Sequence, residues 1–250
     1  AGTSQAPWEF AAPWGARGYV TQFDGPVHWI EFGQDPGNSA DISETPVVFV
    51  HGLGGSHPNW GLIGPRLAAG RRAVALDLHG FGLTPGTREN ATVQANQRLL
   101  DRFVREITGT PVILAGNSMG GLISLLQTAA APDTVQGLVL IDPALPLPVQ
   151  RPDWAVTGQF LLQALPGLGE FYVRRARTRQ SPEVAIMRLI ELCFADPSRA
   201  DPTMLTASIA LASQRQATPG RDDAFLAERF GRNVRDRCGA PRITHRDPSG

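Results

Sequence analysis

The sequence predicts an α/β fold, a doubly wound and mostly parallel sheet, followed by an all-helical segment. Short apolar runs, typical of strands buried on both faces, alternate with amphipathic helical patterns over residues 19–143. Residues 144–236 contain several helical patterns and no convincing strand. A chain of 250 residues that is 42% hydrophobic and 18% charged can bury a sizeable core, so these patterns describe a globular protein.

The composition excludes several classes of function. There are 23 basic and 23 acidic residues, and the resulting net charge of zero gives no general attraction to nucleic acid or to an anionic membrane. Every basic residue is arginine, so no lysine can form a Schiff base, anchor pyridoxal phosphate or complete a Walker A loop. The two cysteines, Cys193 and Cys238, do not make a disulfide framework or a zinc site. We therefore expect a small-molecule substrate, no cofactor, no metal, and neither nucleic acid nor membrane as a partner; the oligomeric state stays open.

The N-terminal residues carry no visible targeting signal. No apolar run approaches the ~20 residues of a membrane-spanning helix, and no basic segment precedes an apolar core. We therefore expect a soluble, cytoplasmic protein. Residues 1–18 are rich in Pro, Gly and Ala, which predicts an irregular arm whose aromatic residues (Trp8, Phe10 and Trp14) dock on the core.

Residues 19–143 form the predicted core. An antiparallel hairpin is expected over Tyr19–Phe23 and Val27–Phe32, around the turn Asp24–Pro26. The other predicted strands are the apolar runs at 47–50, 73–76, 112–115 and 137–141. The predicted helices run from Trp60 to near Gly70 and, with a clear apolar stripe, over 91–107.

One motif carries chemistry. The strand at 112–115 runs into Gly116-Asn117-Ser118-Met119-Gly120, a G-x-S-x-G sequence, and a helical pattern follows until Pro132. The glycines allow a tight turn that holds the serine in a strained conformation, with its hydroxyl clear of the sheet. The start of the helix offers free N–H groups and the positive end of its dipole to a developing oxyanion.

This strand, turn, serine and helix resemble the nucleophile elbow of the α/β-hydrolase superfamily, with Ser118 as the nucleophile. A second stretch, His51-Gly52-Leu53-Gly54, looks like the H-G-x-G turn that family members place beside the nucleophile. The resemblance implies that the backbone N–H groups of Leu53 and Met119 form the oxyanion hole. It also implies a substrate pocket, for which the candidate residues are His51, Gly52, His57 and Asn117.

These histidines and a nearby aspartate admit other roles. A dinucleotide-binding fingerprint fails because His57 stands where a third glycine is needed. For His51 a hydrogen bond that stabilises the turn is favoured over direct chemistry. His57 is expected at the pocket mouth or, in preference, as a solvated loop residue, and His79 at the surface. Asp77 opens a stretch that matches the family's D-x-x-G-x-G-x-S turn, with Thr84 for Ser, and is expected to accept hydrogen bonds from backbone N–H groups.

The helical segment 144–236 resembles the cap that many α/β-hydrolases carry over the active site. Helices are expected near 152–164 and after the N-terminal pairs Ser181-Pro182 and Asp201-Pro202. The arginine-rich stretch Tyr172–Arg179 is interpreted as a solvated helix face in preference to a site for an anionic substrate.

The rest of a catalytic triad is missing from this pattern. In the superfamily the chain order is Ser, then Asp or Glu, then His. Residues 237–250 contain no apolar strand, and His245 precedes Asp247, which is the reverse order. We expect a chain that lacks the last core strands, ends in an irregular tail at 237–250 for which an out-of-frame origin stays open, and has little activity. Asp142, at the end of the strand 137–141, is a weaker candidate for the acid, and a structural role is favoured for it.

These residues predict a serine hydrolase that acts on a small carboxylic ester. Thioesters, lactones and the C–C bonds cleaved by meta-cleavage product hydrolases stay open. Ser118 argues against haloalkane dehalogenases and epoxide hydrolases, which use Asp at that position. The alternative is a catalytically inactive, truncated homologue that at most binds a small apolar ligand.

Overall fold

The computed structural model describes five parts of the 250-residue chain: 2–5, 10–33, 44–87, 89–145 and 181–217. The predicted helix near 152–164, the arginine-rich stretch and the tail lie outside the described residues.

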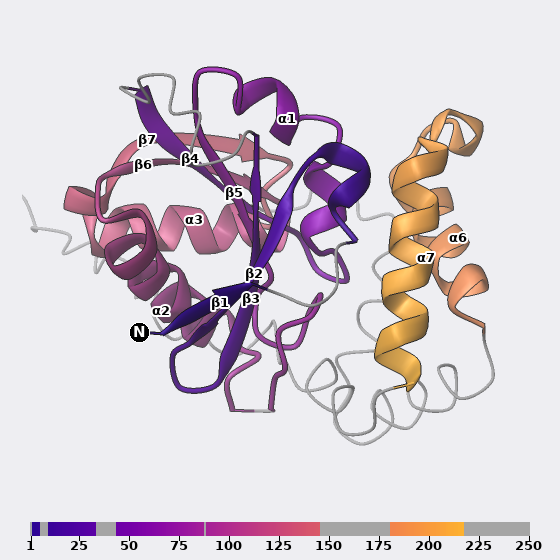
Figure 1. Ribbon diagram of the computed structural model, residues 1–250, viewed down its shortest axis with the longest axis horizontal. Coiled ribbons are helices and arrows are strands. Elements are labelled where there is room, and N and C mark those ends of the chain that lie inside the picture. The colour runs from indigo at the N-terminus through magenta and orange to yellow at the C-terminus, as the bar shows by residue number, and fades with distance from the viewer. Residues whose placement is uncertain (1, 6–9, 34–43, 88, 146–180, 218–250) are drawn as a thin grey trace, which may run out of the picture.

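The described residues form one mixed sheet of seven strands in the order β1-β2-β3-β5-β4-β6-β7 (Figure 1). The strands are β1 (Thr3–Gln5), β2 (Arg17–Gln22), β3 (Pro26–Phe32), β4 (Glu44–Val50), β5 (Arg71–Leu76), β6 (Val112–Asn117) and β7 (Val135–Ile141). β1, β2 and β3 pair antiparallel, as do β3 and β5, whereas β5, β4, β6 and β7 pair parallel. The predicted doubly wound, mostly parallel sheet is confirmed.

Helices cover both faces of this sheet. The α-helices are α1 (Gly64–Leu67), α2 (Val93–Phe103), α3 (Met119–Ala130), α6 (Pro182–Cys193) and α7 (Pro202–Ala217). The short helical turns are η1 (Ala12–Trp14), η2 (His57–Trp60), η3 (Val104–Thr108), η4 (Pro132–Thr134) and η5 (Pro197–Arg199). No helix among the described residues is long and apolar enough to cross a membrane.

The sheet has a separate apolar core on each face. On one face, α2 and α3 bury Leu100, Phe103 and Ile123 against strand residues such as Leu114. On the other face, Trp60 stacks on Phe49 at a ring-centroid distance of 4.8 Å. Alternate side chains of each central strand therefore enter different cores, which explains why these strands are apolar throughout.

Two local predictions were wrong. The helix predicted from Trp60 to Gly70 is broken into η2 and the one-turn helix α1. Glycines interrupt it where the chain is tightly packed: a Cβ at Gly61 would lie 2.3 Å from the Trp14 ring, and one at Gly64 would lie 2.3 Å from the Phe32 ring. The arm is not irregular throughout, because it contains β1 and η1.

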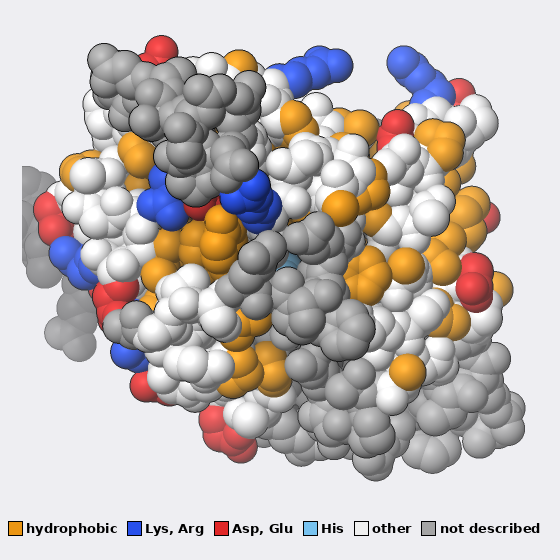
Figure 2. Space-filling model, viewed as in Figure 1, with side chains coloured by type: hydrophobic (Ala, Val, Ile, Leu, Met, Phe, Trp, Pro, Cys, Tyr) orange, Lys and Arg blue, Asp and Glu red, His pale blue; other side chains and the backbone are white. Residues whose placement is uncertain are grey.

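Helices α6 and α7 begin where their N-terminal pairs predict. Ser181 accepts a hydrogen bond from the Val184 N–H and Asp201 accepts one from the Met204 N–H. The two helices pack together and against Trp14 of the arm, beside the sheet (Figure 1). Hydrophobic side chains are exposed over α6 and α7 in Figure 2, and those of α6 include Val184, Met187 and Leu192.

β7 is the outer strand of the described sheet and pairs only with β6. Its last three side chains, Val139, Leu140 and Ile141, are 48%, 37% and 40% exposed. The last three side chains of the central strand β4 are buried. The strand carries no charged residue. An apolar, uncharged edge of this kind is prone to pairing with other chains.

We predict that Val139→Lys keeps the fold and reduces aggregation, because a lysine at an exposed edge position can reach water and discourages strand pairing. Val74→Lys, in the buried centre of β5, is the matched comparison and should prevent cooperative folding, because it buries an unpaired charge. Light scattering and urea unfolding would measure both effects. Loss of the unfolding transition in Val139→Lys would show that β7 is not an exposed edge.

Candidate active site

Ser118 lies at the junction of β6 and α3, in a strained conformation. Its φ of +51° and ψ of −115° are unusual for a residue other than glycine. Such a backbone costs about 1–3 kcal/mol and persists only where the surroundings hold it. The residue is partly exposed.

The glycines on either side of Ser118 are required by close backbone packing. A Cβ on Gly116 would lie 2.5 Å from the Gly120 carbonyl oxygen. A Cβ on Gly120 would lie 2.2 Å from the Val50 carbonyl oxygen and 2.5 Å from that of His51. The start of α3 is therefore pressed against the end of β4, which brings the His51–Gly55 stretch beside Ser118.

The end of β7 is tied to the same turn. The Ile141 carbonyl accepts hydrogen bonds from the Ser118 N–H at 3.0 Å and from the Asn117 side-chain amide at 3.2 Å. The Ala144 N–H donates to the Ser118 carbonyl at 3.0 Å. Asp142 follows at once with a φ of +45°, and its side chain is exposed.

The second glycine-rich stretch forms a tight turn against the serine. The Gly55 N–H donates to the Gly52 carbonyl at 3.0 Å, and Gly54 has a φ of +74°, as a type II turn requires at that position. A Cβ on Gly52 would lie 3.2 Å from Ser118 Cβ and 2.8 Å from Asn117 Oδ1. Three of the predicted site residues, Gly52, Asn117 and Ser118, are thus brought together.

His51 is buried and holds this turn in place. Its Nε2 accepts a hydrogen bond from the Leu78 N–H at 3.1 Å, so the ring proton sits on Nδ1, which donates to the Gly52 carbonyl at 2.8 Å. Burial lowers the pKa of His51, and the charges of His57 and Arg215 lower it further, against the opposing effects of Asp77 and the Gly52 carbonyl. The predicted hydrogen bond to the turn is confirmed, and the buried ring does not line an open pocket.

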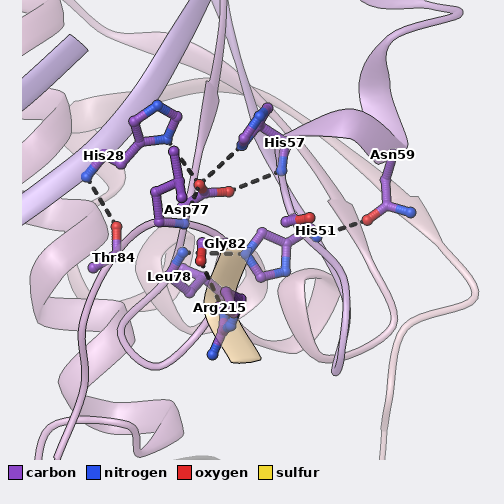
Figure 3. A network of polar contacts seen from close by, with 11 residues as sticks. His28, His51, His57, Asn59, Asp77, Leu78, Gly82, Thr84 and Arg215 are labelled. Atoms are coloured by element: carbon purple, nitrogen blue, oxygen red, sulfur yellow. Dashed lines mark hydrogen bonds and ion pairs between the residues drawn. The ribbon is translucent and has the colours of Figure 1, made fainter. Parts of the chain in front are cut away.

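Asp77 is the centre of a buried polar network (Figure 3). Its Oδ1 accepts from the His57 N–H at 2.8 Å. Its Oδ2 accepts from the Leu83 N–H at 2.9 Å and contacts Nδ1 of His28 at 2.8 Å and Nδ1 of His57 at 2.9 Å. Burial alone would raise the pKa of the Asp77 carboxyl, but attraction to His57 and the hydrogen bonds from both histidines hold it well below its usual value. The predicted bonds to backbone N–H groups are confirmed.

The prediction of a solvated or pocket-mouth His57 was wrong. The His57 side chain is only 1% exposed, because it points inward to Asp77 and not to solvent or a pocket mouth. His79 is partly buried, and burial lowers its pKa.

His28, His57 and Asp77 are the one group among the described residues whose donor atoms lie close enough together to hold a metal ion. Nδ1 of each ring lies within hydrogen-bond distance of Asp77 Oδ2, and an Nδ1–H donated to the carboxylate explains both contacts, so the geometry does not require an ion.

No basic side chain contacts the Ser118 hydroxyl within the described residues. The Ser118 hydroxyl has no hydrogen bond there, and His28, His51 and His57 make the other contacts described above. His245 lies outside the described part. A cavity of about 420 Å³ between the arm and α7 is lined by other residues, not by Ser118.

Sequence reasoning missed His28, Phe81 and Arg215. The Phe81 ring packs edge-on against His51 at a centroid distance of 5.4 Å. Arg215 donates to the carbonyl oxygens of Gly80 at 2.7 Å and Gly82 at 3.0 Å. The Gly-x-Gly pattern around Phe81 marks an unusual loop, but no local signal identifies its partner on α7.

Comparisons with known proteins agree with this geometry. A sequence profile of the alpha/beta hydrolase family matches residues 47–239. The dihydrolipoyllysine-residue acetyltransferase component of the acetoin cleaving system of Pseudomonas putida is 34% identical over 143 residues, which are 53% of this chain and 37% of that protein. An sn-1-specific diacylglycerol lipase of Mus musculus is 31% identical over 104 residues, 41% of this chain and 34% of the lipase. The chain thus spans about a third of the length of these curated relatives.

The crystal structure of Cfl2 from Burkholderia cenocepacia has the same fold, with a TM-score of 0.68 and 21% identity, over 85% of this chain and 70% of that one. Because the family profile covers more than half of the sequence, the chain belongs to the alpha/beta hydrolase family. Its homologues include lipases, and the predicted fold and family are confirmed.

We predict that Asp77→Asn lowers the free energy of unfolding by about 3–5 kcal/mol at pH 7, because it breaks a buried ion-paired network. The folded pKa of Asp77 is depressed, so its stabilisation is present above the unfolded pKa of about 3.9 and is lost as the pH falls through the folded value. The gap between wild type and variant should therefore narrow below about pH 4. Urea unfolding from pH 3 to 7 measures this difference in the free energy of unfolding, with the exposed Asp133→Asn as control. A difference that does not change with pH would contradict a depressed pKa for Asp77.

Proposed function

We propose that the chain is a serine hydrolase that cleaves small carboxylic esters, with Ser118 as the nucleophile. The observation that carries the proposal is the strained backbone of Ser118 between β6 and α3, with Gly52 against its side chain. Members of the family share this fold, and one relative is named as a diacylglycerol lipase. Thioesters, lactones and activated C–C bonds are related substrates that the same serine could attack.

The proposed reaction has two steps. The Ser118 hydroxyl attacks the acyl carbon, the hydroxyl proton passes through a base to the departing alkoxide, and an acyl-enzyme and an alcohol result. Water then attacks the acyl-enzyme, releases the carboxylic acid and restores the serine. The N–H groups of Leu53 and Met119 would stabilise the oxyanion in both steps. The Met119 N–H is suited to this because the first N–H groups of a helix lack partners within it.

Helices α6 and α7 are proposed as part of a cap that covers the site and shapes its specificity. They follow the core strands in the chain and pack beside the sheet, next to the arm. A lid in this position excludes water and orients substrates.

The second candidate is a catalytically inactive homologue that binds a small apolar ligand. The observation in its favour is that the Ser118 hydroxyl has no histidine partner among the described residues. In a well-studied serine protease, loss of the catalytic histidine lowers kcat by about 2 × 10⁶, so a chain without a base would have little activity.

A fluorophosphonate probe and p-nitrophenyl acetate distinguish the two candidates. We expect labelling and turnover in the purified chain, and a loss of at least about 10³-fold in Ser118→Ala, because the nucleophile is then absent. Ser213→Ala, an exposed serine of α7, is the matched control and should retain wild-type rates. His245→Ala tests whether this chain supplies its own base. A folded, monomeric wild type that neither labels nor turns over would exclude the active enzyme.

Asp142 is proposed as a structural residue of the turn and not as the catalytic acid. Asn tolerates a positive φ, so Asp142→Asn should keep the labelling rate of wild type, whereas Asp142→Ala should destabilise the turn by about 1–2 kcal/mol. Labelling kinetics and urea unfolding measure both variants. A fall of about 10⁴-fold in Asp142→Asn would instead assign the acid role to Asp142, since an Asn in place of a triad Asp has an effect of this size.

A further inference from the structure

The loop after β5 lies between helix α7 and the turn beside Ser118. It begins at Asp77, continues through Phe81, and its shape depends on Gly80 and Gly82, whose φ angles are +85° and +51°. A Cβ on Gly82 would lie 2.0 Å from the Asp77 carboxyl carbon, so no other residue fits there. The Asp77 network therefore fixes one side of this loop.

Arg215 fixes the other side. Its guanidinium reaches from α7 and donates one hydrogen bond to the Gly80 carbonyl at 2.7 Å and another to the Gly82 carbonyl at 3.0 Å (Figure 3). The two carbonyls bracket Phe81. The rigid fork of an arginine suits this two-point contact, which the single ammonium of a lysine matches poorly.

Phe81 connects this loop to His51. The ring of Phe81 is buried and meets the His51 ring edge-on, with 5.4 Å between centroids and 65° between planes. In the same loop, the Leu78 N–H donates to His51 Nε2. The position of the loop thus sets both the orientation and the tautomer of His51.

His51 in turn orients the peptide that joins Gly52 to Leu53. The Gly52 carbonyl accepts from His51 Nδ1 and from the Gly55 N–H, which holds it on the inner side of the turn. The peptide is trans, so the Leu53 N–H points in the opposite direction, away from these two donors. Rotation of His51 would free the carbonyl and change the direction of this N–H.

We propose that Arg215 of α7 is a positioning residue for the oxyanion hole: by holding the loop around Phe81, it keeps His51 on the Gly52 carbonyl and the Leu53 N–H directed at the site. The inference rests on the proposed role of Ser118 and adds that the site is complete only when α7 is docked. A helix of the proposed cap would then control the reactivity of the serine without touching the substrate.

The variants Arg215→Ala and Arg215→Lys test the proposal, with the exposed Arg188→Ala of α6 as the control. We expect a fall in kcat and in the rate of fluorophosphonate labelling of about 10-fold or more for Arg215→Ala, with little change in KM. The fall should be smaller than the about 10²–10³-fold lost when an oxyanion donor is removed outright. Arg215→Lys should lie between wild type and Arg215→Ala, and Arg188→Ala should match wild type.

Two measurements do not depend on activity. The groups that face His51 are Asp77, His57, Arg215 and the Gly52 carbonyl, and Arg215 lowers the pKa of His51. Its removal should therefore move the His51 titration, followed by NMR, to higher pH. Hydrogen exchange at the Leu78 amide should also become faster, because this N–H loses its fixed acceptor. Loss of the Arg215 charge alone would also move the titration, and Arg215→Lys, which keeps the charge, is the control for it. A simple tether between helix and loop would leave the Leu78 exchange rate and kcat unchanged.

The outcomes distinguish failure of the proposed function from failure of the positioning role of Arg215. An unlabelled wild type would count against the proposed function, and the NMR and exchange measurements would still decide whether Arg215 controls His51. A labelled wild type with unchanged labelling, titration and exchange in folded Arg215→Ala would overturn the positioning role.

Discussion

The buried carboxylate of Asp77 is the interaction on which the rest of the site depends. It accepts hydrogen bonds from β3, η2 and the loop after β5, three segments that are far apart in the chain. An ionised carboxylate in a buried place is costly unless it is paired and fully hydrogen-bonded, and here four donors meet that requirement. Because any one donor is lost if its segment moves, the carboxylate favours a single arrangement of the loops around the serine.

The strained backbone of Ser118 and the turn beside it are each held by contacts with the rest of the sheet. A serine with a positive φ is held by a helix start pressed on β4 and by hydrogen bonds to the end of β7. The turn at Gly52 is held independently, through His51 and the Asp77 network. Two rigid arrangements from different parts of the sheet therefore meet at Ser118, which would pre-organise the proposed active site.

The sequence was most informative where the determinants are local. Apolar runs identified the central strands, the G-x-S-x-G motif identified the elbow, and Ser-Pro and Asp-Pro pairs identified the starts of α6 and α7. It failed where the partner is distant. His28 lies 49 residues from Asp77, and Arg215 lies 135 residues from Gly80, so no spacing within a segment reports either contact.

The wrong prediction for His57 has its origin in tertiary contacts. A glycine-rich loop suggests solvent exposure, but the Asp77 carboxylate draws the His57 ring inward. The broken helix after Trp60 is similar, since the glycines that interrupt it are explained by rings of Trp14 and Phe32 from other segments. Tertiary packing decided these positions, and local propensity did not.

The exposed edge strand β7 has a consequence for Ser118. Ser118 and Asn117 both donate hydrogen bonds to the carbonyl of Ile141, the last residue of β7. Among the described residues, β7 pairs with β6 alone. Edge strands open by local fluctuation at lower free energy than central ones. The strained serine therefore draws part of its support from one of the least protected strands of the sheet, and local fraying there, well short of unfolding, would be enough to relax it.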